Sequence, residues 1–342
     1  TTLAKLMNGA KTPADRAAKL RVLVREWPDD FALALLLLDA LEDADDAEGA
    51  RDLGKKLRAR PDADARLRTA VGELFLRLAA RGKSPEEKAA DTAEARRAFG
   101  EIVEFAPDDP VARRRLGDLL RAHGWYEDAA RQYETLAKLT PDDPAVYLLL
   151  ASAAEGVGKL EEAVRWAEKA GASGAPDMPQ SAAQTARALA VTYLAWERDA
   201  ARTAGRKDDV EALAVRAARL LAGARALDSK SQGTRATLVW SHPELHPTLW
   251  SNALGAVMPA QEQDVTAGVA HVVVPRRDDA FVEVRIDPED AEHAARLGAT
   301  ATLTVILHEG EEGERIKRFA VKLGPGAAAT QRFRITADEV TP

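Results

Sequence analysis

The dipeptide Pro-Asp recurs along the first two-thirds of the chain, and this repeat constrains the fold more than any other feature. Its prolines are Pro28, Pro61, Pro107, Pro141 and Pro176. The successive spacings are 33, 46, 34 and 35 residues, and between the prolines apolar residues return at helical spacing, with two helices to each period. A period of this length predicts stacked helix pairs, each of which buries its apolar face against its neighbours.

The clearest period lies between the prolines at 107 and 141. Its characteristic residues are Arg113, Leu116, Gly117 and Leu120 on the first helix, then Ala129 and Tyr133 on the second. The same places in the next period are taken by Tyr147, Leu150, Ala151, Ala154, Ala163 and Ala167. Small residues allow the two helices to cross closely, and the closing proline ends the second helix because proline cannot continue it. Asp109 and Asp143 each precede a proline, as an N-cap precedes proline at the first helical position.

These residues resemble the tetratricopeptide repeat family from about residue 12 to about residue 228. The resemblance implies an all-α superhelical solenoid whose concave side binds a protein or peptide, with irregular first and last units. The unit ending at Pro107 is longer than the next one, since Gly72 to Pro107 spans 35 residues and Gly117 to Pro141 spans 24. We expect the 11 additional residues around positions 82–91, as a longer loop or an extended helix.

The chain changes character near Gly233, where Val, Thr and Ile in short alternating runs replace a composition rich in Ala, Leu, Arg, Asp and Glu. We therefore expect two domains, residues 1–232 and 233–342, separated by the polar segment 228–232. The second domain contains seven predicted strands: Arg235–Trp240, Thr248–Trp250, Ala270–Val274, Phe281–Ile286, Thr300–Leu307, Arg315–Leu323 and Thr330–Ile335.

Seven short strands in about 110 residues predict an antiparallel β-sandwich. The fold class is therefore α + β multidomain, a helical solenoid followed by a sandwich. Residues 309–313 and 324–326 are expected at hairpin tips, and residues 287–292 in a single helical turn. Residues 238–250 are faintly similar to a sandwich domain of uncharacterised function that lies beside helical repeats in bacterial proteins. The aspartates of that family's pattern are missing here, so no site residues are carried over.

Charge and composition exclude several classes of protein. With 48 Lys and Arg against 55 Asp and Glu, the net charge is −7, which argues against a nucleic-acid partner. The absence of cysteine excludes disulfides and thiolate metal sites. The longest apolar run, Phe31–Leu38, is far shorter than the roughly 20 residues of a membrane span. There is no signal sequence, and the first residue is Thr, as in a processed form or a fragment; the cytoplasm and the bacterial cell envelope both stay open, as does the oligomeric state.

One group of residues resembles a metal site. His242 and His246 are four residues apart, with Glu244 between them and His271 in the same domain. Two histidines at this spacing bind zinc when they share one face of a helix, but Pro243 and Pro247 prevent a helix here. We therefore assign no metal and keep a metal-dependent hydrolase as an alternative.

Other catalytic motifs are missing. The sequence contains no Gly-x-Ser-x-Gly elbow and no glycine-rich phosphate loop. The glycines at positions 310 and 313 lie among acidic residues, which would repel phosphate. The sequence therefore predicts a protein that is not an enzyme and that needs no cofactor.

The first helix of each pair lines the concave side of such a solenoid. The pattern places six residues there: Arg114, Asp118, Arg121, Leu148, Ser152 and Glu155. Arg114 and Arg121 are seven residues apart, about two helical turns, so both should point into the groove and favour an acidic or C-terminal peptide. As exposed charges, both should tolerate reversal to Glu with little loss of stability.

The leading hypothesis is a non-enzymatic interaction or scaffold protein. A protein or peptide partner binds in the groove, and the sandwich caps the array or binds a second partner. The alternative is an envelope- or carbohydrate-binding sandwich with the repeats as a spacer, which requires a row of exposed aromatic side chains on one sheet face. The candidates for that row are Trp240, Trp250, Phe281, Phe319 and Phe333.

Overall fold

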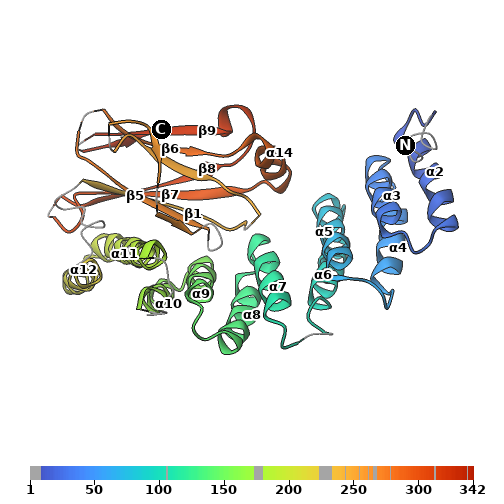
Figure 1. The fold of residues 1–342 in the computed structure, drawn as a ribbon, viewed down its shortest axis with the longest axis horizontal. Coiled ribbons are helices and arrows are strands. Elements are labelled where there is room, and N and C mark those ends of the chain that lie inside the picture. The colour runs from blue at the N-terminus through green and yellow to red at the C-terminus, as the bar shows by residue number, and fades with distance from the viewer. Residues whose placement is uncertain are drawn as a thin grey trace. The chain divides into compact units, whose positions relative to one another are not determined.

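The computed structural model describes residues 9–104, 107–172 and 180–222, and residues 233–342 except 243, 254, 261, 265–267, 278, 312 and 337 (Figure 1). Three features named from the sequence lie outside the described residues: Pro176, Pro243 and the polar segment 228–232. The chain forms two compact units, Thr1–Ala112 and Arg113–Pro342. The composition change near Gly233 thus falls within the second unit, and the boundary predicted there stays a prediction.

The first unit is helical throughout its described part. Its helices are α2 (Pro13–Glu26), α3 (Phe31–Asp43), α4 (Ala47–Arg58), α5 (Ala65–Arg81) and α6 (Pro85–Gly100). Each begins at a capping residue whose side chain accepts a hydrogen bond from the third helical N–H. These caps are Thr12, Asp30, Asp46, Asp64 and Ser84. The caps satisfy amide groups that have no partner within the helix, which explains where each helix starts.

The additional residues of the long unit extend its helices. Helix α5 has 17 residues and α6 has 16, and only residues 82–84 separate them. The extended helix is therefore the correct one of the two predicted forms. Asp91, at the end of the predicted insertion, is buried on α6 and binds Arg51 of α4 at 2.8 Å. This ion pair ties the extended helix to its neighbour in the same unit.

Three further helix pairs follow, and the first of their helices begins at Pro110, three residues before the second unit. They are α7 (Pro110–Ala122), α8 (Tyr126–Leu139), α9 (Pro144–Gly156), α10 (Leu160–Ala172), α11 (Gln180–Thr203) and α12 (Lys207–Leu221). Gly117 and Ala129 are buried, as expected of small residues at a close crossing, and Tyr133 packs against Gly117. Asp109 and Asp143 accept hydrogen bonds from the amides of Val111 and Ala145, which confirms both caps.

The rest of the second unit is a β-sandwich of two antiparallel sheets. Sheet A has the order β4 (Glu262–Asp264), β5 (Val269–Val274), β1 (Thr234–Trp240), β7 (Thr300–Leu307) and β8 (Arg315–Lys322). Sheet B has the order β10 (Val340–Thr341), β9 (Thr330–Ile335), β6 (Ala280–Arg285), β2 (Thr248–Ser251) and β3 (Met258–Pro259). All seven predicted strands are present. The strands β3, β4 and β10 were not predicted, because two or three residues are too few for an alternating pattern.

Two local expectations were wrong. Residues 287–292 belong to a ten-residue helix, α14 (Pro288–Leu297), rather than to a single turn. The helix is longer because Ala291 and Ala294 bury one face and Gly298 ends it in the left-handed conformation, at φ 63°. The turn at residues 324–326 is not a hairpin tip, since it leads from β8 of sheet A to β9 of sheet B. By contrast, residues 309–311 and 313 do lie at the tip between the paired strands β7 and β8.

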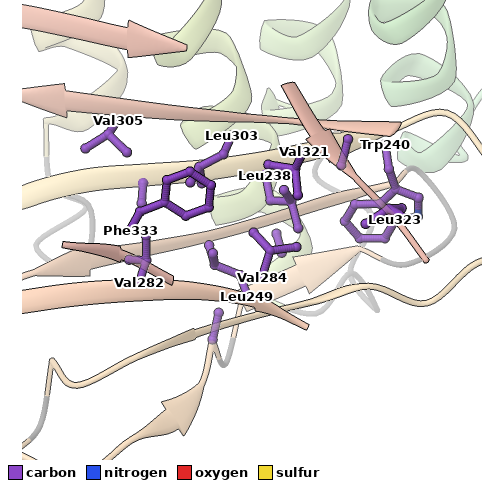
Figure 2. Packing of buried hydrophobic residues seen from close by; sticks show 14 of the residues in the cluster. Leu238, Trp240, Leu249, Val282, Val284, Leu303, Val305, Val321, Leu323 and Phe333 are labelled. Carbon is purple, nitrogen blue, oxygen red and sulfur yellow. The ribbon is translucent and has the colours of Figure 1, made fainter. Parts of the chain in front are cut away.

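The sandwich core is the space between the two sheets (Figure 2). Sheet A contributes Leu238, Leu303, Val305 and Val321, and sheet B contributes Leu249, Val282, Val284 and Phe333. Along each strand these residues alternate with residues that point away from the core, so one face of each sheet is apolar.

The outer face of sheet A packs on the helices of the same unit. Helix α11 contacts all five strands of this sheet. The helix is buried on every side, with every residue from Ala188 to Trp196 below 6 % exposure. Three layers therefore follow one another in the second unit: repeat helices, sheet A and sheet B (Figure 1).

We expect Gly117→Ala to lower the free energy of unfolding by about 1–3 kcal/mol, because overpacking a close contact typically costs that much. The new Cβ would lie 2.5 Å from Cε1 of Tyr133, whose ring is fully buried. The control is Gly100→Ala, whose Cβ would meet nothing within 4 Å and which should be neutral or stabilise by up to about 1 kcal/mol. Urea unfolding followed by circular dichroism measures both, and equal effects would contradict the close crossing.

Candidate partner-binding groove

The structure brings the six predicted groove residues to neighbouring first helices. Three lie on α7 (Arg114, Asp118 and Arg121) and three on α9 (Leu148, Ser152 and Glu155). Nη1 of Arg121 donates to Oγ of Ser152 at 3.3 Å, which joins the two sets directly. The two sets of predicted residues therefore lie side by side, on neighbouring first helices.

Their exposure differs from what an open groove requires. Arg121, Leu148 and Ser152 are 0, 1 and 5 % exposed. Arg114 and Asp118 are half-buried, and Nε of Arg114 lies 3.6 Å from Oδ2 of Asp118. The expectation that Arg121 is an exposed charge is therefore wrong, because another part of the unit covers its side chain.

The β-sandwich packs on the repeat helices of the same unit through α11. Helix α9 has nine consecutive buried residues, Val146 to Ala154, and such a run leaves no side of a helix in water. Two charge effects also connect the helices with the sandwich. Burial raises the pKa of Glu155 on α9, and the charge of Arg318 on β8 opposes this shift. Burial lowers the pKa of His242, in the loop after β1, and the charge of Arg121 on α7 adds to this shift. Figure 1 shows the sandwich on the same side of α9 and α11. The concave positions of α9 therefore face the sandwich.

Polar side chains hold the sandwich on α11. Glu314, just before β8, accepts hydrogen bonds from Nε and Nη2 of Arg198 at 3.1 and 2.7 Å. Arg202 adds a third contact to Glu314, at 2.8 Å. Oγ1 of Thr192 lies 2.9 Å from Oγ1 of Thr237 on β1. Two parallel hydrogen bonds between a guanidinium and a carboxylate require one mutual orientation, so this contact sets the position of the sandwich.

The pKa values of three carboxylates near this contact are shifted in different directions. Burial raises the pKa of Asp118, against the charge of Arg121 and a 2.7 Å hydrogen bond from the Tyr133 hydroxyl. Burial likewise raises the pKa of Glu155. Burial would also raise the pKa of Glu314, but the hydrogen bonds and charge of Arg198 hold that pKa below its usual value. Of these three carboxylates, Glu314 has the close cationic partners that a fully buried carboxylate needs.

The contact residues Arg198 and Glu314 were missed at the sequence level. Arg198 lies in the charged run 197–199, and Glu314 lies in the acidic run 309–314. Charged runs like these are normally solvated on a protein surface, and no local signal marks the two members that become buried. The only hint is that α11 is apolar around its whole circumference, which requires a partner on each side.

The three candidate metal-binding histidines have separate partners. Nδ1 of His242 lies 3.2 Å from Oγ of Ser241, and Nδ1 of His246 lies 3.0 Å from Oδ2 of Asp290 on α14. His271 is buried on β5, opposite Thr237 of β1. Across the described part of the chain, no three or more His, Asp or Glu side chains are grouped so that they could hold a metal ion.

The aromatic side chains of the sandwich do not form an exposed row. Trp240 and Phe333 are buried in its core. Trp250 and Phe281 are half-buried, and each is covered by a guanidinium, from Arg285 at 4.0 Å and Arg332 at 4.2 Å from the ring centre. Phe319 contacts Phe333, with ring centres 5.0 Å apart. The required feature of a carbohydrate-binding sheet face is therefore not met by these five residues.

We expect Arg121→Glu to lower the free energy of unfolding by roughly 3 kcal/mol or more, because it leaves a buried carboxylate without a cationic partner. Arg114→Glu is the matched control on the same helix, and its half-exposed position should limit the loss to about 1 kcal/mol. Urea unfolding of the two variants separates these cases. Equal, small losses would mean that Arg121 is in water and that the sandwich does not cover it.

A pH dependence follows from His242. Burial, with the nearby charges of Arg121 and His293, lowers the pKa of His242 to about 4. The unfolded chain takes up a proton near pH 6.5, so the contribution of this residue to the free energy of unfolding is complete above that pH and falls as the pH drops towards 4. The loss should reach about 3 kcal/mol, at about 1.4 kcal/mol per pKa unit. Stability curves of the parent and His242→Gln between pH 7 and 4 should converge; parallel curves would exclude a buried neutral imidazole.

The chain was compared with known protein families and structures. The tetratricopeptide repeat model matches residues 88–153. Among solved structures, the tetratricopeptide repeat protein TTC0263 of Thermus thermophilus is 18 % identical over 53 % of this chain and 90 % of that chain, with a TM-score of 0.32. MamA (residues 41 to the end) of Desulfovibrio magneticus RS-1 is 19 % identical over 59 % of this chain and 98 % of that chain, with a TM-score of 0.32.

A third structure, the TPR2AB domain of yeast Sti1 in a complex named pHSP90, is 16 % identical over 64 % of this chain and 90 % of that chain, with a TM-score of 0.24. No curated protein matches the chain. The assignment therefore rests on the matched residues and on the helix pairs themselves, with Gly117 and Tyr133 at their close crossing. Residues 88–153 thus match the tetratricopeptide repeat family, within a series of helix pairs that precedes a C-terminal β-sandwich.

Proposed function

We propose that this chain is a non-enzymatic interaction protein whose repeats bind a protein segment on their concave side, while its sandwich caps the array. Stacked repeats expose an extended concave surface suited to such ligands, and terminal repeats need a cover for their apolar outer face. The observation that carries the proposal is the change in burial at equivalent repeat positions along the chain.

Equivalent positions can be aligned on the small residues of the first helices, Gly117 in α7 and Ala151 in α9. The position of Ser152 is fully buried in α9, and the equivalent Asp118 in α7 is half-buried. The position of Leu148 is likewise buried in α9, and the equivalent Arg114 in α7 is half-buried. At the third equivalent pair the order is reversed, since Arg121 in α7 is 0 % exposed and Glu155 in α9 is half-buried. We infer that the sandwich occupies the concave side of α9 at the first two positions, and we place the partner on α7 at Arg114 and Asp118.

The chemistry of α7 fits a peptide with an acidic and apolar character. Arg114 offers a guanidinium that is only partly covered, with a side chain 26 % exposed. Val111, one turn earlier on the same helix, is 73 % exposed and offers apolar area. Charges around an apolar anchor set partner choice and association rate, while the anchor supplies most of the affinity. Neither a nucleic acid nor a cofactor is part of the proposal. In the described residues, no helix combines the length and the apolar character of a membrane span.

The test uses the full chain with a photocrosslinking side chain at position 111 or 114, in extracts of the native host. Position 131 on α8 is the control, because Arg131 is exposed on a second helix, with 66 % of its side chain in water. We expect the same partner to be captured from positions 111 and 114 and not from 131. Capture from 131 alone, or different proteins from each position, would refute a concave binding surface.

A further inference from the structure

We infer that the open side of the β-sandwich, between strands β8 and β9, binds an extended acidic segment of another protein, which adds as a strand to β8. This site is separate from the concave repeat surface and does not depend on it. Three independent observations carry the inference: a free strand edge, an aromatic groove beside it, and a one-signed charge distribution around both.

Strand β8 is an edge strand over its full length. All eight of its residues pair with β7, and among the described strands none pairs with its other side. The ends of this edge are occupied: Nη1 of Arg315 donates to the carbonyl of Asp338 at 2.7 Å, and Nε2 of Gln331 donates to the carbonyl of Lys322 at 2.7 Å. The stretch from 316 to 321 between them keeps a row of backbone groups that a further strand can pair with.

A groove of about 490 Å³ lies between β8 and β9. Phe319, Ala320 and Phe333 line it, with Arg318, Gln331 and Arg332 at the same opening. The rings of Phe319 and Phe333 contact each other across the two sheets, at 5.0 Å between centres. Sheet B leaves this side open because β10 pairs only with residues 334 and 335 of β9. The groove therefore offers an apolar site directly beside the free edge.

The charged side chains of strands β8 and β9 all have one sign. Strands β8 and β9 carry six basic residues and no carboxylate: Arg315, Lys317, Arg318, Lys322, Arg332 and Arg334. All six are exposed, and they make up six of the 11 lysines and arginines between residues 233 and 342, a part of the chain that holds 16 Asp and Glu. Among the described residues, Lys317, Lys322 and Arg334 have no ion pair. A concentrated positive patch on an acidic domain is complementary to an acidic partner.

The geometry of the edge also sets the pattern of the partner. Phe319 lies opposite Leu303, a core residue, and Arg318 lies opposite Thr304 on the outer face of sheet A. A strand added beside β8 alternates in the same way, with one set of side chains towards Phe319 and Phe333 and the other towards Arg318 and Lys322. The expected ligand is therefore a segment in which apolar and acidic residues alternate.

Synthetic peptides of about ten residues, long enough to pair with β8, serve as probes on the full chain. One alternates Val and Glu, a second has the same composition with its Glu residues in one block, and a third alternates Val and Lys. Affinity is measured by fluorescence anisotropy at two salt concentrations. Hydrogen exchange of residues 315–322 reports strand addition directly, because the free amides of β8 become protected only if a strand pairs with them.

Arg318→Glu/Lys322→Glu should weaken binding of the alternating acidic peptide by roughly tenfold or more. Arg296→Glu/Arg219→Glu is the matched control, since it changes the net charge equally at exposed positions on α14 and α12. It should change the affinity by less than about threefold. If the first variant fails to fold, Arg334→Glu on β9 replaces it and should weaken binding in the same direction.

The expected result is preference for the alternating acidic peptide, with protection of β8. Equal binding of the block peptide without that protection would overturn the inference and indicate general attraction of polyanions, as would equal competition by a single-stranded oligonucleotide. No binding at about 1 mM, with self-association of Arg318→Glu/Lys322→Glu, would also overturn it. In that case the charges would only prevent edge-to-edge pairing between copies.

Discussion

The burial of helix α11 on all of its sides is the constraint on which the second unit depends. A helix with apolar residues around its circumference needs a partner in every direction. Its repeat neighbours α10 and α12 supply part of the cover, and sheet A supplies the rest. Repeats and sandwich therefore share one buried layer, and exposing it would cost both.

Apolar burial alone does not set the angle at which a sheet sits on a helix. The bidentate contact of Arg198 with Glu314 does, because both groups are fully buried and Arg198 without Glu314 would be an unpaired charge in the interior. The Thr192–Thr237 contact fixes a second point on the same interface. These polar contacts contribute specificity more than stability, since a buried ion pair loses in desolvation much of what it gains in attraction.

The sandwich covers one part of the concave repeat surface and leaves another part exposed. Over α9 the surface serves the fold, as the burial of Leu148 and Ser152 indicates. Over α7 the equivalent positions keep partial exposure, and the proposed partner binds there. The free edge of β8 is separate from both parts of this surface. The outer face of sheet A contacts the helices, whereas the edge of β8 faces solvent. Two separate binding surfaces on one chain are what a scaffold requires.

The helix pairs, the close crossing at Gly117 and the seven main strands were all predictable, because each depends on local periodicity, caps and turns that the chain encodes within about ten residues. The relative placement of Arg114, Arg121 and Ser152 also followed from the repeat. The length of α14 and the crossover at residues 324–326 did not, since both depend on which sheet receives the next strand. The burial of Arg121 was not predictable from the sequence either. The same holds for the pairing of Arg198 with Glu314, which lies 116 positions away. Local sequence determined the helices, the strands and the residues expected to face the groove. Only the tertiary structure decided that the sandwich fills part of this groove, because that outcome depends on the complementarity of the folded surfaces of the repeats and the sandwich.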